Sequence, residues 1–213
     1  MTELRWYDKF APFYDFGTVG DVFYRKPRKA AIEQLNLSGG SSVVDVFCGT
    51  GVDFSLLADQ VGDDGSVLAV DGSEGMLEEA KARAERCAFS THFEFLQADF
   101  SKAGGLERME EAITMKAFRN VFFSLGLTCL ANWWEFCSAV FDACPSGTTV
   151  SIMDVYSDRL TPGARFINWI GAADCRRPVW RVLEQRSERF AWQEFRPFKV
   201  LDVSVVVASG RKP

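Results

Sequence analysis

The stretch VVDVFCGTGVDFSLL, residues 43–57, decides the fold. Its first residues are apolar, as in a short buried strand, and they carry a single acid, Asp45. Gly49 and Gly51 then predict a tight turn whose backbone N–H groups approach a ligand closely, and the residues after them have the spacing of a helix. A strand, a glycine turn and a helix in this order form a ligand-binding unit, because a helix N-terminus favours negative charge.

Strand-like and helix-like segments alternate through the next hundred residues. The expected strands are Val43–Phe47, Ser66–Val70, Phe93–Gln97, Phe118–Ser124 and Thr148–Asp154. The expected helices between them are Val52–Val61, Ser73–Cys87, Gly105–Met115 and Asn132–Cys144. Such alternation implies right-handed crossovers and a mainly parallel sheet with both faces covered.

The C-terminal part no longer alternates between strand-like and helix-like segments. An arginine-rich helical stretch near Arg177–Gln185 precedes two strand-like runs, Phe190–Phe195 and Val203–Ser209, with a polar link that contains Pro197. These runs predict an antiparallel pair at the sheet edge. The expected fold class is therefore α/β: a doubly wound, Rossmann-like, seven-stranded and mostly parallel sheet closed by an antiparallel C-terminal strand pair. With no repeat or linker, we expect a single domain, 1–213, made of a helical lid segment (1–40), a binding core (41–156) and substrate-side helices with the closing strands (157–213).

Three successive strands are expected to end in acids. Besides Asp45, VLAVDGS ends its strand on Asp71, whose carboxylate can accept both hydroxyls of a ribose. FLQADF ends the next strand, and it places Asp99 and Phe100 where a polar atom and a ring can hold an adenine. Because ligands bind at the carboxyl ends of parallel strands, these side chains predict one nucleoside pocket.

A dinucleotide-binding Rossmann domain also uses a glycine turn and a ribose-binding acid. Its fingerprint needs a third glycine for close helix packing, and the run Gly49-Thr50-Gly51-Val52-Asp53-Phe54 has none. It also has no use for an acid such as Asp45 just before the turn. The pattern therefore argues against NAD-type binding.

The chain resembles the class I SAM-dependent methyltransferases, and within them the small quinone-biosynthesis and phospholipid N-methyltransferase-like group. The resemblance spans nearly the whole chain and rests on YDKFAPFYD (7–15), VVDVFCGTG (43–51), VLAVDGSEGMLEEAKARAE (67–85), LQADF (96–100), SLGLTCLANWWEF (124–136) and VVVASGRKP (205–213). It implies S-adenosyl-L-methionine (SAM) as cofactor.

The resemblance also implies roles for single residues. The methionine end of SAM would lie against Asp45, Gly49 and Gly51, the ribose on Asp71, and the adenine between Asp99 and Phe100. Further contacts would come from residues that line the adenosine, cover the pocket or lie near the sulfonium: Gly72, Met76, Tyr14 and Ser124. The chain departs from the family pattern at Phe47, at Arg119-Asn120 and at Pro145-Ser146-Gly147. Phe47 replaces the usual first glycine of the turn, and we expect it to narrow the methionine pocket.

Methyl transfer from a sulfonium depends largely on alignment and desolvation, so a dedicated base is optional. Asp154 and Tyr14 are the candidate catalytic residues, and Tyr7, Tyr156 and Trp169 are candidate substrate contacts. His92 is the sole histidine, and it precedes the strand Phe93–Gln97. We therefore expect it at the sheet end opposite the pocket.

Composition limits the partners. A net charge of −5 and a pI near 5.1 disfavour a nucleic-acid substrate. The chain has 19 phenylalanines, enough to fill a core and also to line a cavity for an apolar substrate. Two basic clusters, Arg25–Lys29 and Arg176–Arg181, suit either a solvated face or an anionic head group at a peripheral membrane contact.

The sequence also bears on the cellular compartment and on metal binding. No apolar run approaches the length of a transmembrane segment, and MTELRWYDKF lacks the apolar core of a signal peptide, so we expect a cytoplasmic protein. The six cysteines are scattered and predict no metal site.

The leading functional hypothesis is SAM-dependent methylation of an N or O atom on a small or lipid-like acceptor. An amino phospholipid and a quinone-like phenol remain open as acceptors. A hypothesis of a different class is a SAM-binding accessory protein without turnover.

Overall fold

The computed structural model describes residues 20–102, 104–198 and 201–213. Tyr7, Tyr14 and the rest of the aromatic N-terminal cluster lie outside the described residues. Their expected place in a lid therefore stays a prediction.

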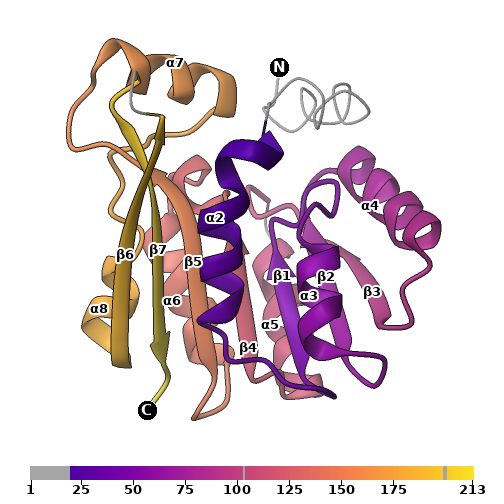
Figure 1. Ribbon diagram of the computed structural model, residues 1–213. Helices are drawn as coiled ribbons and strands as arrows, with labels where there is room; N and C mark the ends of the chain where they lie inside the picture. Colours follow the sequence, from indigo (N-terminus) through magenta and orange to yellow (C-terminus); the bar gives the residue numbers. More distant parts are fainter. Residues whose placement is uncertain (1–19, 103, 199–200) are drawn as a thin grey trace.

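A seven-stranded sheet with the strand order β3-β2-β1-β4-β5-β7-β6 crosses the centre of the molecule (Figure 1). Strands β1 to β5 pair in parallel, whereas β7 runs antiparallel to both β5 and β6. The strands are β1 Ser42–Val46, β2 Ser66–Asp71, β3 His92–Gln97, β4 Asn120–Ser124, β5 Thr149–Tyr156, β6 Glu188–Phe198 and β7 Val203–Arg211. The predicted fold class, including the antiparallel C-terminal pair, is confirmed.

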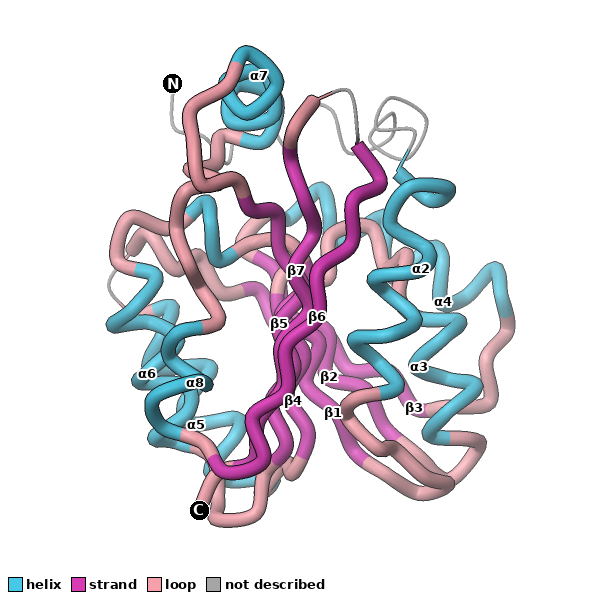
Figure 2. Tube along the Cα trace, turned by 60° about the vertical axis from the view of Figure 1, so that its left-hand side comes forward, coloured by secondary structure: helices cyan, strands magenta, loops and turns pink. Residues whose placement is uncertain are grey.

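Helices cover both faces of the sheet, as Figure 2 shows with the sheet close to edge-on. Helices α2, α3 and α4 lie on one face, and α5, α6 and α8 lie on the other. Each layer buries an apolar stripe: Leu57 and Val61 of α3 pack on one face, and Phe136 and Val140 of α6 pack on the other. The helices are α2 Gly20–Glu33, α3 Phe54–Val61, α4 Glu74–Cys87, α5 Gly105–Lys116, the short 3₁₀ turn η1 Leu127–Cys129, α6 Trp133–Ala143, α7 Pro162–Gly171 and α8 Arg181–Arg186.

Two of the boundaries that differ from the sequence prediction have a clear physical reason. Strand β1 ends at Val46, because Phe47 adopts a left-handed conformation with φ +63°. The expected polar link around Pro197 is wrong, since this proline lies within β6. A proline is tolerated there because β6 is an edge strand, where a missing N–H removes few sheet hydrogen bonds.

Helix α7 was not predicted. It begins after Thr161, whose hydroxyl accepts a hydrogen bond from the Ala164 N–H at 3.1 Å, and its first residue is a proline. It lies beyond the carboxyl ends of the strands, on the same side of the sheet as the glycine turn (Figure 1). The sequence therefore supplies one more element at the ligand-binding end.

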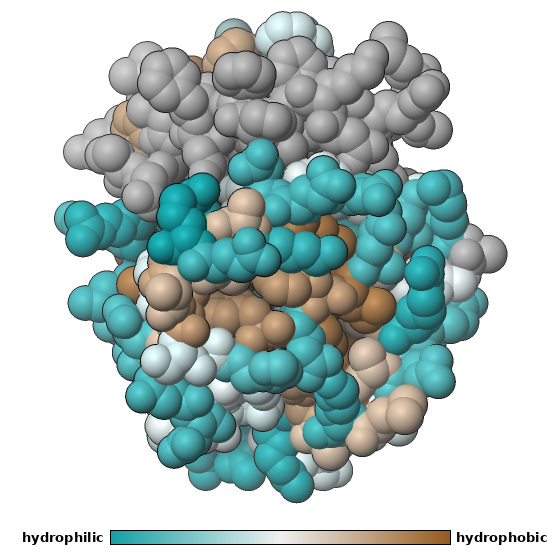
Figure 3. Space-filling view, turned by 90° about the vertical axis from the view of Figure 1, so that its right-hand side faces the viewer, coloured by the Kyte–Doolittle hydropathy of each residue, from teal (hydrophilic) through white to brown (hydrophobic). Residues whose placement is uncertain are grey.

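Strand β3 forms the other edge of the sheet, and its four inner residues are only half-buried. Figure 3 shows apolar surface between hydrophilic side chains on this side of the molecule. His92 opens the strand at its amino end with 69% of its side chain exposed, so its predicted distance from the pocket is confirmed. Within the ranges described, no helix is long and apolar enough to cross a membrane.

Candidate functional site

The carboxyl ends of β1, β2 and β4 bring three polar side chains to one face of the sheet. Asp45 is in register with Ala69 of β2 and with Phe122 of β4. Asp71 and Ser124 each follow two residues later, and side chains two residues apart on a strand share a face. The register thus places Asp45 and Asp71 on the same face of the sheet, the face that α2 and α3 cover.

Asp71 holds two turns together. One of its carboxylate oxygens accepts a hydrogen bond from the Gly49 N–H at 2.9 Å, and the other accepts one from the Ser73 N–H at 2.9 Å. Ser73 in turn caps α4 by accepting the Met76 N–H at 3.2 Å. Asp71 therefore ties the glycine turn to the loop that contains Gly72, in addition to its predicted contact with a ribose.

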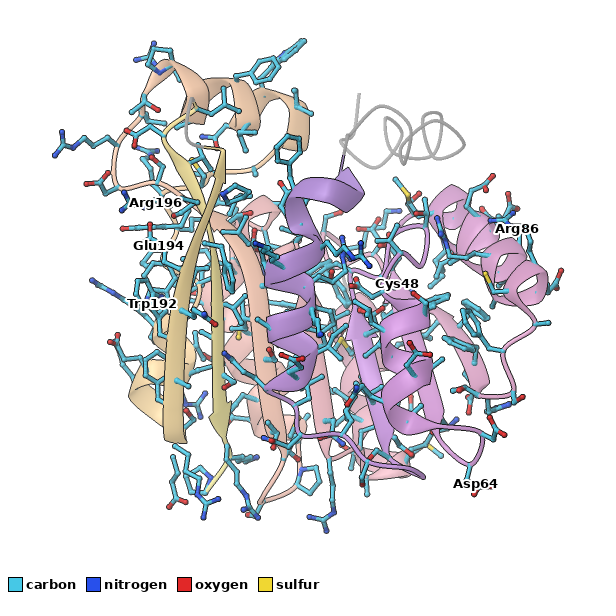
Figure 4. All side chains as sticks on the ribbon, in the orientation of Figure 1. Cys48, Asp64, Arg86, Trp192, Glu194 and Arg196 are labelled. Carbon is cyan, nitrogen blue, oxygen red and sulfur yellow. The ribbon has the colours of Figure 1, made fainter. Side chains whose placement is uncertain are left out.

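The glycine turn needs glycine at both predicted positions. Gly49 and Gly51 have φ of +54° and +77°, which favours residues without a Cβ. A Cβ on Gly51 would also lie 2.5 Å from the ring of Phe54. A Cβ on Gly49 would meet nothing within 4 Å in the structure as described, so the positive φ and not a steric contact is what favours glycine here. Figure 4 shows the neighbouring Cys48 at this end of the sheet, between α2 and α4.

Asp45 is completely buried, and neither of its carboxylate oxygens has a hydrogen-bond partner among the described residues. Burial raises the pKa of Asp45 well above its ordinary value, and the nearby Asp53 and Asp71 raise it further, while Arg28 acts to lower it. An unpaired carboxylate is costly in a protein interior. A bound cation would relieve that cost, which makes Asp45 a candidate ligand contact.

The predicted adenine contacts lie after β3. Asp99 accepts hydrogen bonds from the Ser101 N–H at 3.0 Å and the Ser101 hydroxyl at 2.5 Å, and its other oxygen lies 2.7 Å from Lys102 Nζ. Burial acts to raise the pKa of Asp99, but these bonds from Lys102 and Ser101 lower it overall, so the group is a carboxylate at neutral pH. Phe100 is 9% exposed and packs with its ring centroid 4.4 Å from that of Phe136.

Phe47 does not face the acid-bearing side of the sheet. Its ring packs against Phe100 at 5.5 Å, Phe136 at 5.8 Å and Phe123 at 6.4 Å, in the core beneath α5 and α6. A Cβ on Gly126 would lie 2.1 Å from this ring, so the absence of a side chain there makes room for it. Phe47 therefore does not narrow the methionine pocket as the sequence predicts; the ring instead borders the predicted adenine contact Phe100.

Two site residues escaped the sequence analysis. Arg28 of α2 belongs to the basic cluster that the sequence assigns either to a solvated face or to an anionic head group, but it is 5% exposed and pairs with the fully buried Asp53 at 2.5 Å. The second oxygen of Asp53 accepts the hydroxyl proton of Ser124 at 2.7 Å. A charged residue at an N-cap position directly after the glycine turn was the signal that could have revealed Asp53.

The second basic cluster is also largely engaged with the protein. Arg176 makes paired contacts with Asp174 at 2.9 and 3.0 Å, and Arg177 donates to the Thr128 carbonyl at 2.5 Å. The contact of Arg177 with Thr128 fixes the loop after β4 to the segment that follows α7. Arg28, Arg176 and Arg177 are therefore weaker evidence for an anionic head group than the sequence indicated, whereas Arg25, Lys26, Lys29 and Arg181 are exposed.

The predicted catalytic and substrate residues are spread over the carboxyl end. Asp154 is buried and accepts hydrogen bonds from Thr128 Oγ1 at 2.7 Å, the Thr128 N–H at 3.0 Å and the Val155 N–H at 2.8 Å. Tyr156 packs against Trp180 with ring centroids 4.6 Å apart. Trp169, on α7, is 80% exposed. The structure thus gives Asp154 a place in holding the loop after β4, and its catalytic role stays a prediction.

Asp154 makes stability depend on pH. Burial raises the pKa of Asp154 from 3.8 to about 6, although the hydrogen bonds from Thr128 and Val155 act to lower it. Because the folded-state pKa exceeds the unfolded value, this group stabilises the fold fully below pH 3.8, and the contribution is lost as the pH rises through about 6. The free energy of unfolding that Asp154 contributes should therefore fall by about 3 kcal/mol between pH 3.8 and about 6, and Asp154→Asn should remove this pH dependence.

Urea unfolding of both proteins from about pH 4 to pH 7 checks this expectation. The exposed Asp158, changed to asparagine, is the matched control and should leave the decline intact. Parallel pH curves for wild type and Asp154→Asn would contradict the assignment.

Comparison with known proteins agrees with this geometry. A family described as a methyltransferase domain matches residues 37–126. A 23S rRNA (uracil(1939)-C(5))-methyltransferase of Acinetobacter baylyi is 34% identical over 144 residues, which are 58% of this chain and 31% of that protein. A demethylmenaquinone methyltransferase of Shouchella clausii is 37% identical over 81 residues, 35% of this chain and 34% of that protein. The chain thus spans about a third of the length of these relatives.

Among solved structures, a geranyl diphosphate C-methyltransferase of Streptomyces coelicolor, crystallised with Mg²⁺, geranyl diphosphate and S-adenosyl-L-homocysteine, shares the fold. The TM-score is 0.66 at 11% identity, over 89% of this chain and 79% of that one. This likeness shows that the two proteins share a Rossmann-like fold with the same kind of mostly parallel sheet. The domain match and the methyltransferase relatives support a SAM-dependent methyltransferase.

Proposed function

We propose that the protein transfers a methyl group from SAM to a small acceptor with a large apolar portion. The observation that carries this proposal is the buried Asp45 beside the glycine turn, because its two unpartnered oxygens suit the α-ammonium group of the methionine moiety. Asp71 lies at the next strand end, on the same face, where the ribose of the same ligand would extend.

SAM supplies an electrophilic methyl group when it is bound. The protein's part is to bind the two ends of the nucleoside, orient the acceptor and exclude water, which together bring the reacting atoms into line. Asp45, Gly49 and Gly51 would hold the methionine end, Asp71 the ribose, and Asp99 with Phe100 the adenine. The depressed pKa of Asp99 keeps it an acceptor for the adenine amino group.

Exposed apolar side chains at the ligand-binding end support an apolar acceptor. Phe166, Trp169 and Ile170 of α7 are 49%, 80% and 38% exposed, and Leu160 just before the helix is 39% exposed. Burying a few hundred Å² of such surface against an acceptor would contribute roughly 25 cal/mol per Å². Two proteins similar to this chain are named for demethylmenaquinone and geranyl diphosphate, both largely apolar. A quinone-like acceptor fits this surface, and so does an amino phospholipid.

RNA is the second candidate acceptor, because the rRNA methyltransferase match extends over more of this chain than the quinone match does. The net charge of −5 opposes it, since RNA binding depends on phosphate neutralisation by basic residues. We therefore rank the apolar acceptor first.

The test has two stages. SAM and S-adenosyl-L-homocysteine should raise the melting temperature, whereas NAD should not, because the turn lacks the third glycine of a dinucleotide site. Release of S-adenosyl-L-homocysteine is then measured with a short-chain demethylquinone, phosphatidylethanolamine vesicles and an rRNA transcript. The quinone or the lipid should give product. Product with the transcript alone would make RNA the acceptor in place of the apolar molecule. SAM binding without product from any of the three acceptors would indicate an accessory protein.

A further inference from the structure

We infer that the Arg28–Asp53 ion pair is a positioning device for the amino-acid end of the cofactor, acting through Asp45 and Ser124. The inference rests on the proposed function, since it requires SAM to bind with its methionine end at the glycine turn. Arg28 itself touches neither the nucleoside nor the reacting atoms; it sets the charge and hydrogen-bond direction of the groups that do.

The pair is built from two helices that meet at the acid-bearing face of the sheet. Arg28 lies in α2, and Asp53 is the residue directly before α3. The side chains are 6% and 1% exposed and their atoms are 2.5 Å apart. A buried ion pair of this kind gives little net stability compared with apolar packing, so stability alone does not account for its presence.

Asp53 determines what Ser124 can offer a ligand. The Ser124 hydroxyl donates its single proton to Asp53 at 2.7 Å, so its remaining lone pairs can only accept. Asp45, on the neighbouring strand and the same face, is also purely an acceptor when ionised. Two acceptors without a donor suit a cationic group with several N–H bonds, such as an α-ammonium group.

Arg28 determines the charge of that acceptor set. Three acids, Asp45, Asp53 and Asp71, meet at these strand ends, and burial with Asp53 and Asp71 raises the pKa of Asp45. Arg28 opposes that rise from α2, while the remaining titratable neighbour, the Cys48 thiol, has its own pKa raised by burial and by the same acids. Strand β4 adds Ser124, which is neutral. Arg28 therefore favours the carboxylate form of Asp45, although the pKa of Asp45 stays above its ordinary value.

Two variants that break the same ion pair should have opposite effects. Arg28→Gln removes the cation, so Asp45 ionises at higher pH and the binding of S-adenosyl-L-homocysteine shifts to higher pH by about half a unit or more. Asp53→Asn removes an anion, so the binding midpoint shifts to lower pH. The double variant Arg28→Gln/Asp53→Asn replaces the charges by a neutral amide pair and should return the midpoint close to that of wild type. A purely structural ion pair predicts no such opposition.

The measurement is calorimetric binding of S-adenosyl-L-homocysteine from about pH 5 to pH 8. 5′-Methylthioadenosine, which lacks the amino-acid end, is the control ligand, and its midpoint should not move in any variant. Arg186→Gln removes a surface ion pair of the same length, 2.5 Å to Asp142, and serves as the control variant. Ser124→Ala should weaken S-adenosyl-L-homocysteine several-fold without moving the midpoint, because it removes an acceptor but no charge.

Shifts in the same direction for Arg28→Gln and Asp53→Asn, or an equal shift for methylthioadenosine, would overturn the inference. If Arg28→Gln fails to fold, Asp53→Asn and the double variant still show in which direction the pH midpoint of binding shifts. Unchanged affinity for S-adenosyl-L-homocysteine in Ser124→Ala would show that Ser124 is not a hydrogen-bond acceptor for the amino-acid end of the cofactor. Absence of binding in the wild type at every pH would instead overturn the proposed function itself.

Discussion

Replacing Asp71 with alanine should weaken SAM binding by a factor of roughly 100 or more, about 3 kcal/mol. The ribose hydroxyls would lose a charged acceptor, which costs about 1–3 kcal/mol. The structure adds a second loss, because the N–H groups of Gly49 and Ser73 both donate to this carboxylate at 2.9 Å. Without Asp71, the two turns on either side of the ligand are no longer tied to each other.

Calorimetric titration with SAM measures this effect. Asp71→Asn keeps one acceptor oxygen and should lose less affinity than the alanine variant. Asp64 lies at the opposite end of the molecule (Figure 4), so Asp64→Ala should bind as wild type does. Wild-type affinity in Asp71→Ala would place the ribose elsewhere.

Replacing Gly126 with alanine should destabilise the protein by about 3 kcal/mol, the upper end of the usual cost of overpacking. The new methyl group would lie 2.1 Å from the Phe47 ring, and three further aromatic rings hold that ring in place. Gly126 has a negative φ of −145°, so the backbone tolerates alanine and the cost is steric. The expected loss corresponds to roughly 6–12 °C in melting temperature.

Phe47→Gly tests the cause. This change leaves a cavity, but it removes the ring with which the new methyl group collides, so Phe47→Gly/Gly126→Ala should be more stable than the sum of the single changes by about 2 kcal/mol. A Cβ on Gly39 meets nothing within 4 Å in the structure as described, which makes Gly39→Ala the matched control with little expected change. If the stability losses of Phe47→Gly and Gly126→Ala simply add in the double variant, Gly126 is required for a reason other than its contact with Phe47.

Much of the fold follows from local patterns. The apolar run at β1, the glycine turn after it and the alternation of strands and helices are all readable from neighbouring residues, because burial on both faces of a parallel sheet demands continuous apolar strands. The predicted association of Asp45 with Asp71 follows equally, since parallel strands place their carboxyl ends together. Helix α7 was missed although its cap, Thr161 followed by Pro162, is a local signal. The inclusion of Pro197 in β6 was missed because edge position depends on segments that are distant in the chain.

The amino-acid sequence by itself determined the mostly parallel sheet and its order of acids, because those depend on periodicity and on short spacings. The cofactor class came from the resemblance to a known family. Only the tertiary structure decided which residues Arg28 and Phe47 contact. An arginine in a basic run looks solvated until α2 packs against the turn and meets Asp53, 25 residues away. A phenylalanine in a glycine turn looks obstructive until β4 brings Gly126 beside it. Both outcomes depend on contacts between segments that only the packed sheet brings together, and no local pattern encodes which side chain will meet which.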